Sequence, residues 1–156
     1  IEETKMATIT DAVVKTDAIF NFATQWYYKN PTVSGIPTIS DADFIAFKTF
    51  LKQEKISLDT ETNKALKNVL ETAKKEKIDT QITNEYKQLE LANEKNQEME
   101  LDKNKNQIKK LIQEDLITRY QYREGLYQFY TKENLEIEKA IALLNNQTQY
   151  KSILKK

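Results

Sequence analysis

Apolar residues recur every three or four positions along most of the chain, which is the period of an amphipathic α-helix. The first such pattern predicts a helix that begins at a cap, Thr10 or Asp11, and runs to about Lys29. Aromatic residues lie on more than one face of this helix, so we expect it to be buried from several sides. It should end at Asn30, because the residue before a proline is pushed out of the helical conformation.

Loop composition is concentrated in one segment. Residues 30–39 contain both prolines and one of the two glycines. Ser40 follows, and its spacing to Asp43 is that of a capping box with an aspartate in place of the usual glutamate. A second helix is therefore predicted to begin at Ser40. Its apolar stripe consists of Phe44, Phe47, Phe50 and Leu51.

The middle of the chain carries a weaker helical signal. A third helix is predicted from a cap at Asp59 or Thr60 to about Lys77, and a further helical period fades after Ala92. Residues 93–107 contain few apolar side chains and neither glycine nor proline. This segment is either a mobile hinge or two helix ends that meet in a short exposed loop.

A strong apolar stripe returns over residues 108–120 and predicts a helix that continues to Tyr127 or beyond. Gly125 lies inside it, where glycine costs about 1 kcal/mol relative to alanine. Its presence therefore indicates a close helix approach or a bend. Thr131 is predicted to cap the next helix, which ends at Asn145-Asn146, and residues 147–154 form a last short helix.

The chain as a whole is predicted to be all-α. No strand-like alternation and no fixed-period repeat is evident, so an irregular helical bundle of about six helices without a sheet is the simplest architecture. We expect residues 1–8 to be a tail or the end of an upstream domain, and residues 9–156 to form a single helical domain. The length suits one domain with a real core.

Composition argues against most chemistry. The 156 residues contain no His and no Cys, and only two Gly, so imidazole chemistry, thiolate chemistry and a Gly-rich phosphate loop are all excluded. Charge is balanced, with 24 basic and 24 acidic side chains interspersed along the chain. Nucleic-acid binding needs clustered Lys and Arg, so we predict no nucleic-acid partner. No apolar run approaches the ~20 residues of a membrane span.

The chain begins at Ile1 rather than Met. We therefore expect a processed product or an excised piece, with any targeting segment outside it. The lack of cysteine fits a reducing compartment and fits a bacterial periplasmic protein equally well. Composition alone does not decide the compartment.

Three kinds of candidate chemistry are weak. Ser152 and Lys156 have the spacing of a Ser–Lys dyad, but they lie at the end of the chain with nothing after them to enclose a site. Residues 93–107 are rich in acids and amides, yet lysines interrupt them and the glycine of a calcium loop is missing. Paired carboxylates are better explained as helix caps and solvated faces; they are Asp41/Asp43, Glu98/Glu100 and Glu114/Asp115. We predict no catalytic, cofactor-binding or metal-binding residue.

Aromatic residues gather in two places, around Trp26 and over residues 120–130, where arginines are interleaved. Such clusters can be core residues with polar tips, an anchor for a protein partner, or a stacking surface for single-stranded bases. Net zero charge disfavours the last of these. The candidates for a partner surface are Trp26, Tyr27, Tyr120 and Tyr122.

Residues 17–28, with the sequence DAIFNFATQWYY, resemble the opening of the C-terminal helical region of carboxy-terminal processing (tail-specific) proteases. These enzymes form the S41 peptidase family, and the likeness is closest to its Bacteroidetes-type branch. Residues 40–56, 112–130 and 137–154 resemble the later helices of that region in the expected order. Within residues 112–130, the runs ITRY and YREG carry most of the likeness.

The resemblance implies a parent enzyme with a PDZ module and a Ser–Lys protease core, exported to the periplasm. Those parts would lie upstream of Ile1, and residues 1–5 would be the end of the protease core. None of the family's catalytic motif maps onto this chain, so the chain by itself is predicted not to be an enzyme. Its role would be to brace the core, to form a homo-oligomer, or to dock a partner that delivers substrate.

A second hypothesis stands beside the first. The chain could be a stand-alone helical adaptor or structural interaction protein that shares only an amphipathic texture with the protease family. No cofactor is expected under either hypothesis.

Overall fold

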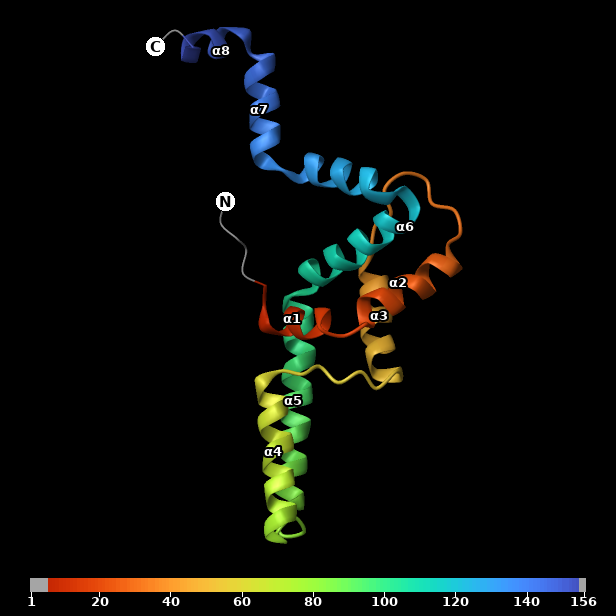
Figure 1. The fold of residues 1–156 in the computed structure, drawn as a ribbon, viewed down its shortest axis with the longest axis vertical. Coiled ribbons are helices and arrows are strands. Elements are labelled where there is room, and N and C mark those ends of the chain that lie inside the picture. The colour runs from red at the N-terminus through yellow and green to blue at the C-terminus, as the bar shows by residue number, and fades with distance from the viewer. Residues whose placement is uncertain (1–5, 155–156) are drawn as a thin grey trace.

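The computed structural model describes residues 6–154, which contain eight α-helices and no strand. The prediction of an all-α chain is confirmed, with more helices than the six expected. Figure 1 shows an elongated molecule in which the α4–α5 hairpin extends from one end and α7–α8 from the other. The helices are α1 (Thr8–Val14), α2 (Ala18–Lys29), α3 (Asp41–Gln53), α4 (Glu61–Glu76), α5 (Thr83–Lys103), α6 (Lys105–Glu133), α7 (Leu135–Asn145) and α8 (Gln147–Leu154).

The hydrophobic core lies where α1, α2 and α3 meet the first part of α6, and we call this region the centre. Phe47 is fully buried there, and its ring meets that of Phe22 edge-on with 5.2 Å between the ring centroids. The core face of α6 is equally buried and follows the apolar stripe predicted over residues 108–120. Its fully buried members are Ile108, Ile112, Leu116 and Ile117.

The first predicted helix is in fact two helices, so the expectation of one helix to Lys29 is wrong. The break falls at Thr16, whose hydroxyl donates to the Val13 carbonyl at 2.7 Å and accepts from the Ala18 N–H at 3.2 Å. A threonine side chain that bonds to nearby backbone competes with helical hydrogen bonds. The predicted end at Asn30, just before Pro31, is confirmed for α2, which ends at Lys29.

The Pro- and Gly-containing loop that follows α2 packs against α6. The Gln113 side-chain amide donates to the Pro37 carbonyl at 2.8 Å, and that of Gln121 donates to the Gly35 carbonyl at 2.7 Å. The loop ends at the predicted capping box. There the Ser40 side chain accepts from the Asp43 N–H, and the Asp43 side chain accepts from the Ser40 N–H.

Helices α4 and α5 form an antiparallel hairpin, which we call the arm (Figure 1). Thr60 caps α4, as one of the two predicted alternatives. Two helix ends meet within residues 93–107, as one of the two predicted alternatives, because α5 runs to Lys103 and α6 begins at Lys105. Only Asn104 separates α5 from α6, and its side chain donates to the Glu100 carbonyl at 2.8 Å.

Helix α6 bends sharply at Tyr122, where the backbone has a φ of 55° and a ψ of −155° (Figure 1). The two halves of the helix fold toward each other, so that Lys110 lies 5.5 Å from the centre of the Phe129 ring. Gly125 sits on the inner side of this bend. A Cβ atom there would lie 2.9 Å from Ile117 Cγ2, which confirms the predicted link between this glycine and a bend.

The last two helices extend away from the centre (Figure 1). Asn134 caps α7, since its side-chain oxygen accepts from the N–H groups of Glu136 and Ile137 at 2.9 and 3.2 Å. The prediction of a cap at Thr131 is therefore wrong; its hydroxyl donates to the Tyr127 carbonyl inside α6. The predicted end of α7 at Asn145-Asn146 and the last short helix are confirmed.

The predicted division between residues 1–8 and 9–156 stays a prediction. Helix α1 begins at Thr8, and residues 1–5 lie outside the described part of the chain, as do residues 155–156. None of the helices within residues 6–154 is both long and apolar enough to cross a membrane.

Candidate functional site

Three of the four predicted surface aromatics meet at one junction. Trp26 and Tyr27 project from α2, and Tyr120 from α6. The Tyr27 and Tyr120 ring centroids are 4.8 Å apart, and Trp26 meets Tyr120 edge-on at 6.4 Å. All three side chains are half-buried. The junction therefore packs α2 against α6 and leaves only part of each ring exposed.

The polar groups of Trp26 and Tyr120 also form hydrogen bonds. The Trp26 indole N–H donates to Asp43 Oδ1 at 2.9 Å, and the Tyr120 hydroxyl donates to the Asn30 carbonyl. Burial, together with the nearby Tyr27, raises the pKa of Tyr120 above its usual value. Burial also raises the pKa of Asp43, but hydrogen bonds from Ser40 and Trp26 outweigh it and hold that pKa below its usual value. The junction thus links the end of α2 to the capping box of α3.

Tyr122 does not join the junction. It lies at the bend of α6 with 73% of its surface exposed. The second aromatic group continues beyond it: Tyr127 is exposed, whereas Phe129 is buried under Lys110. The assignment of Trp26, Tyr27, Tyr120 and Tyr122 to a partner surface stays a prediction.

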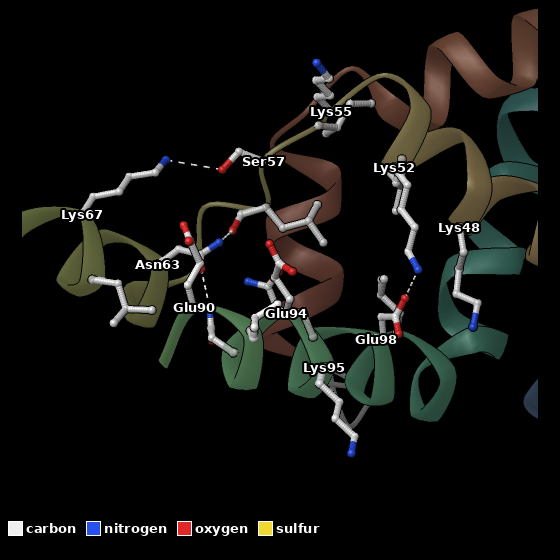
Figure 2. Close-up of a pocket in the computed structure, with 18 of the residues that line it drawn as sticks. Lys48, Lys52, Lys55, Ser57, Asn63, Lys67, Glu90, Glu94, Lys95 and Glu98 are labelled. Atoms are coloured by element: carbon white, nitrogen blue, oxygen red, sulfur yellow. Dashed lines mark hydrogen bonds and ion pairs between the residues drawn. The ribbon is translucent and has the colours of Figure 1, made fainter. Parts of the chain in front are cut away.

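A hollow lies elsewhere, at the base of the arm. It has a volume of about 740 Å³, and the end of α3, the linker after it, α4 and α5 form its walls (Figure 2). Apolar side chains from all four segments line it: Leu51, Ile56, Leu58, Leu66, Leu91 and Leu101. This is within the size range of ligand-binding pockets, about 300–1,000 Å³. We call it the cleft.

Eight charged side chains line the cleft, and half of them form ion pairs. Lys48 bridges to Asp102 at 2.6 Å, and Lys52 bridges to Glu98. Lys67 reaches Asp59 at 3.3 Å. These pairs tie α3 to α5, and the linker to α4.

Sequence reasoning missed the cleft. Its walls come from residues 48–67 and 86–101, which are distant in the chain and meet only through the hairpin. Residues 93–107 were predicted to be a hinge or two helix ends in a short exposed loop, and neither alternative indicates the wall of a cleft. A pair of acids one turn apart beside leucines, at Glu90 and Glu94, was the one local signal available.

The weaker chemical candidates do not assemble into a site within the described residues. Asp41 is bound by Lys109 and Lys105, whose hydrogen bonds hold its pKa below the usual value. Glu98 and Glu100 each pair with a lysine, and Asp115 pairs with Arg119. Ser152 is exposed on α8, and Lys156 lies outside the described residues. No group of three or more metal-ligating side chains occurs within residues 6–154.

Residues 9–144 match a protein family described as the C-terminal helical domain of a probable PDZ-protease. This match covers most of the chain, from α1 through nearly all of α7, and the chain belongs to that family. The fold agrees, since the described residues form helices and no strand. No curated protein and no solved structure shows significant similarity to the chain.

Proposed function

We propose that this chain is the non-catalytic C-terminal domain of a periplasmic Ser–Lys carboxy-terminal processing protease of the S41 family, and that it braces the protease core. Membership in the PDZ-protease family supports the parent enzyme. The lack of His and Cys in the sequence supports a role without chemistry of its own. Its immediate partners would be the PDZ and protease domains upstream of Ile1.

The observation that carries the bracing role is the exposed apolar face of α7. This helix packs chiefly against α6 and α8, its neighbours in the chain, and projects from the centre (Figure 1). Ile141 is 52% exposed and Leu144 is 56% exposed, one turn apart on the same side. Apolar side chains grouped on a projecting helix are typical of a docking surface.

The test uses the whole protein with Ile141→Asp and Leu144→Asp combined. We expect the protease transition in a calorimetric scan to move to lower temperature, and peptide cleavage to fall. Ile45→Asp on α3 is the matched control, because Ile45 is also exposed, at 61%, but lies on the centre. If both proteins behave as the unmodified enzyme does, α7 does not brace the core.

The aromatic candidates offer a second role, the docking of an adaptor or substrate. Tyr122 is the useful probe, because its ring is exposed and Tyr122→Ala removes little packing. On this proposal the substitution weakens capture of a partner without lowering thermal stability. Trp26→Ala and Tyr120→Ala should lower stability, since their rings pack α2 against α6.

A stand-alone adaptor, or a homo-oligomer of the free chain, is the alternative. An antibody raised to this chain distinguishes these cases on a blot of fractionated cells. A periplasmic band far heavier than 18.3 kDa supports the parent protease. A single band near 18.3 kDa without a larger precursor supports the adaptor.

A further inference from the structure

The cleft at the base of the arm has an apolar floor that is open at one edge. Leu51, Leu58 and Leu101 are buried at its base. Leu91 also lines the cleft and is 64% exposed, so an apolar contact is available at the mouth. A partner that inserts apolar side chains would remove this surface from water, at about 25 cal/mol per Å² buried.

Five lysines and three glutamates line the cleft, and the unpaired charges among them that point inward are negative. The lysines on the α3 and α4 walls are neutralised by their own carboxylate partners. Glu90 and Glu94 have no cationic partner in the described part of the chain, and Figure 2 shows both carboxylates directed from α5 toward the linker. Lys55 and Lys95 also border the cleft, but their side chains extend away from it in the same view.

The spacing of these two acids limits the occupant. Glu90 and Glu94 lie one turn apart on α5, which is about 6 Å along the axis. Two basic side chains one turn apart on a facing helix have the same spacing. Helices also form both long walls, and a groove between two helices accepts the apolar face of a third.

We propose that the cleft binds an amphipathic helical segment of a partner protein that carries two Lys or Arg residues one turn apart beside its apolar face. The leucines take the apolar side chains, and Glu90 and Glu94 take the two cations. This site lies on the arm, away from α7, and does not depend on the bracing role.

The first experiment selects ligands from a phage-displayed library of random peptides against the 156-residue chain. We expect the enriched peptides to be apolar with two basic residues four positions apart. The same selection on Glu90→Gln/Glu94→Gln should lose these peptides. No enrichment, or enrichment of peptides without basic residues, would overturn the proposal.

The second experiment measures fluorescence anisotropy with the most enriched peptide. We expect about tenfold weaker binding to Glu90→Gln/Glu94→Gln, and a loss that shrinks at high salt. Glu71→Gln/Glu76→Gln is the matched control, since these exposed acids of α4 lie outside the cleft. Equal weakening in both variants would mean attraction to the whole arm, and no specific site.

Leu91→Gln tests the apolar half of the site without disturbing the core, because Leu91 is already exposed. We expect it to weaken peptide binding severalfold at unchanged thermal stability. Sedimentation of the chain alone tests whether a second copy of the chain occupies the cleft. If the chain is a dimer and Glu90→Gln/Glu94→Gln dissociates it, a second copy of the chain fills the cleft. This result would overturn the proposal that a different protein binds there. Neither result bears on α7, so the bracing proposal succeeds or fails separately.

Discussion

The centre and the arm are both helical, yet different forces hold them. In the centre, large side chains such as Phe47, Ile108 and Ile112 are wholly removed from water. In the arm, α4 buries only Ala73 and α5 buries only Leu101, while Val69 is 50% exposed. Helices in one chain can therefore be stabilised mainly by burial of side chains in one region and mainly by local helix-forming interactions in another.

The arm compensates for its small core with local interactions. Thr60 caps α4, and the residues after it are mostly good helix formers. The Asn93 side chain donates to that of Asn63 between the two helices. Because each such contribution is small, we expect the arm to open more readily than the centre.

The largest expected effect is in the centre. Phe47→Ala removes a fully buried ring that packs against Phe22 and should lower the free energy of unfolding by about 3–5 kcal/mol. Val69→Ala in the arm should change it by less than about 0.5 kcal/mol. Urea unfolding followed by far-UV circular dichroism measures both. Similar losses in the two variants would break the comparison.

The bend of α6 comes next. Gly125→Ala places a Cβ atom 2.9 Å from Ile117 Cγ2, so the bend must shift, at about 1–3 kcal/mol. Gly35→Ala meets no atom within 4 Å, but its φ of 76° is strained for alanine. We expect a smaller loss there, about 1 kcal/mol. If Gly35→Ala costs more than Gly125→Ala in the same urea measurement, crowding at the bend is not what requires a glycine.

Asp43 couples the aromatic junction to the α3 cap. Asp43→Asn should cost about 1 kcal/mol at neutral pH. The folded pKa of Asp43 lies below its unfolded value, so the carboxylate stabilises the fold above the unfolded pKa of about 3.8. That contribution is lost as the pH falls through the folded pKa. Unfolding curves of the two proteins should therefore converge in acid.

A double-mutant cycle locates the Asp43 effect. Trp26→Phe keeps a ring but removes the N–H that donates to Asp43. If the indole N–H contributes, the losses from Trp26→Phe and Asp43→Asn will not add. Strict additivity would mean that Asp43 acts through Ser40 alone.

The smallest effect is a gain in the arm. Lys77 follows α4 with a left-handed φ of 61°, and the Ile78 N–H donates back to the Ala73 carbonyl at 3.0 Å. Glycine is the preferred residue in this position, so Lys77→Gly should stabilise the chain by about 0.5–1 kcal/mol. Lys75→Gly, inside α4, should instead cost about 1 kcal/mol. Thermal melts of the two variants should move in opposite directions.

The sequence predicted well those elements that depend on neighbours in the chain. Ser40 and Asp43 were enough to predict the cap of α3, and Pro31 the end of α2. Gly125 predicted a bend in α6, but the non-helical backbone is at Tyr122. The residue with the positive φ is therefore not the residue at which a Cβ atom would be crowded. Membership in a family of C-terminal helical domains of PDZ-proteases also agrees with the resemblance found in the sequence.

Other features could not be predicted because non-local packing or unusual residues determine them. Lys77 occupies a left-handed position that glycine normally marks, so the turn between α4 and α5 carried no glycine signal. Helix α5 continues past Ala92 without an apolar stripe, because Leu101 near its C-terminal end packs into the core with the end of α3. The cleft joins residues 48–67 to residues 86–101, which are too far apart in the chain for short-range patterns to predict it.

Trp26 has a practical consequence for experiments, because it is the single tryptophan of the sequence. Its indole lies at the junction of α2, α3 and α6, with Tyr120 at its edge. Selectively excited tryptophan emission therefore reports the melting of the centre, whereas circular dichroism also records the arm. If the arm opens first, the two optical signals will give separate midpoints in one titration, and no label will be needed to observe it.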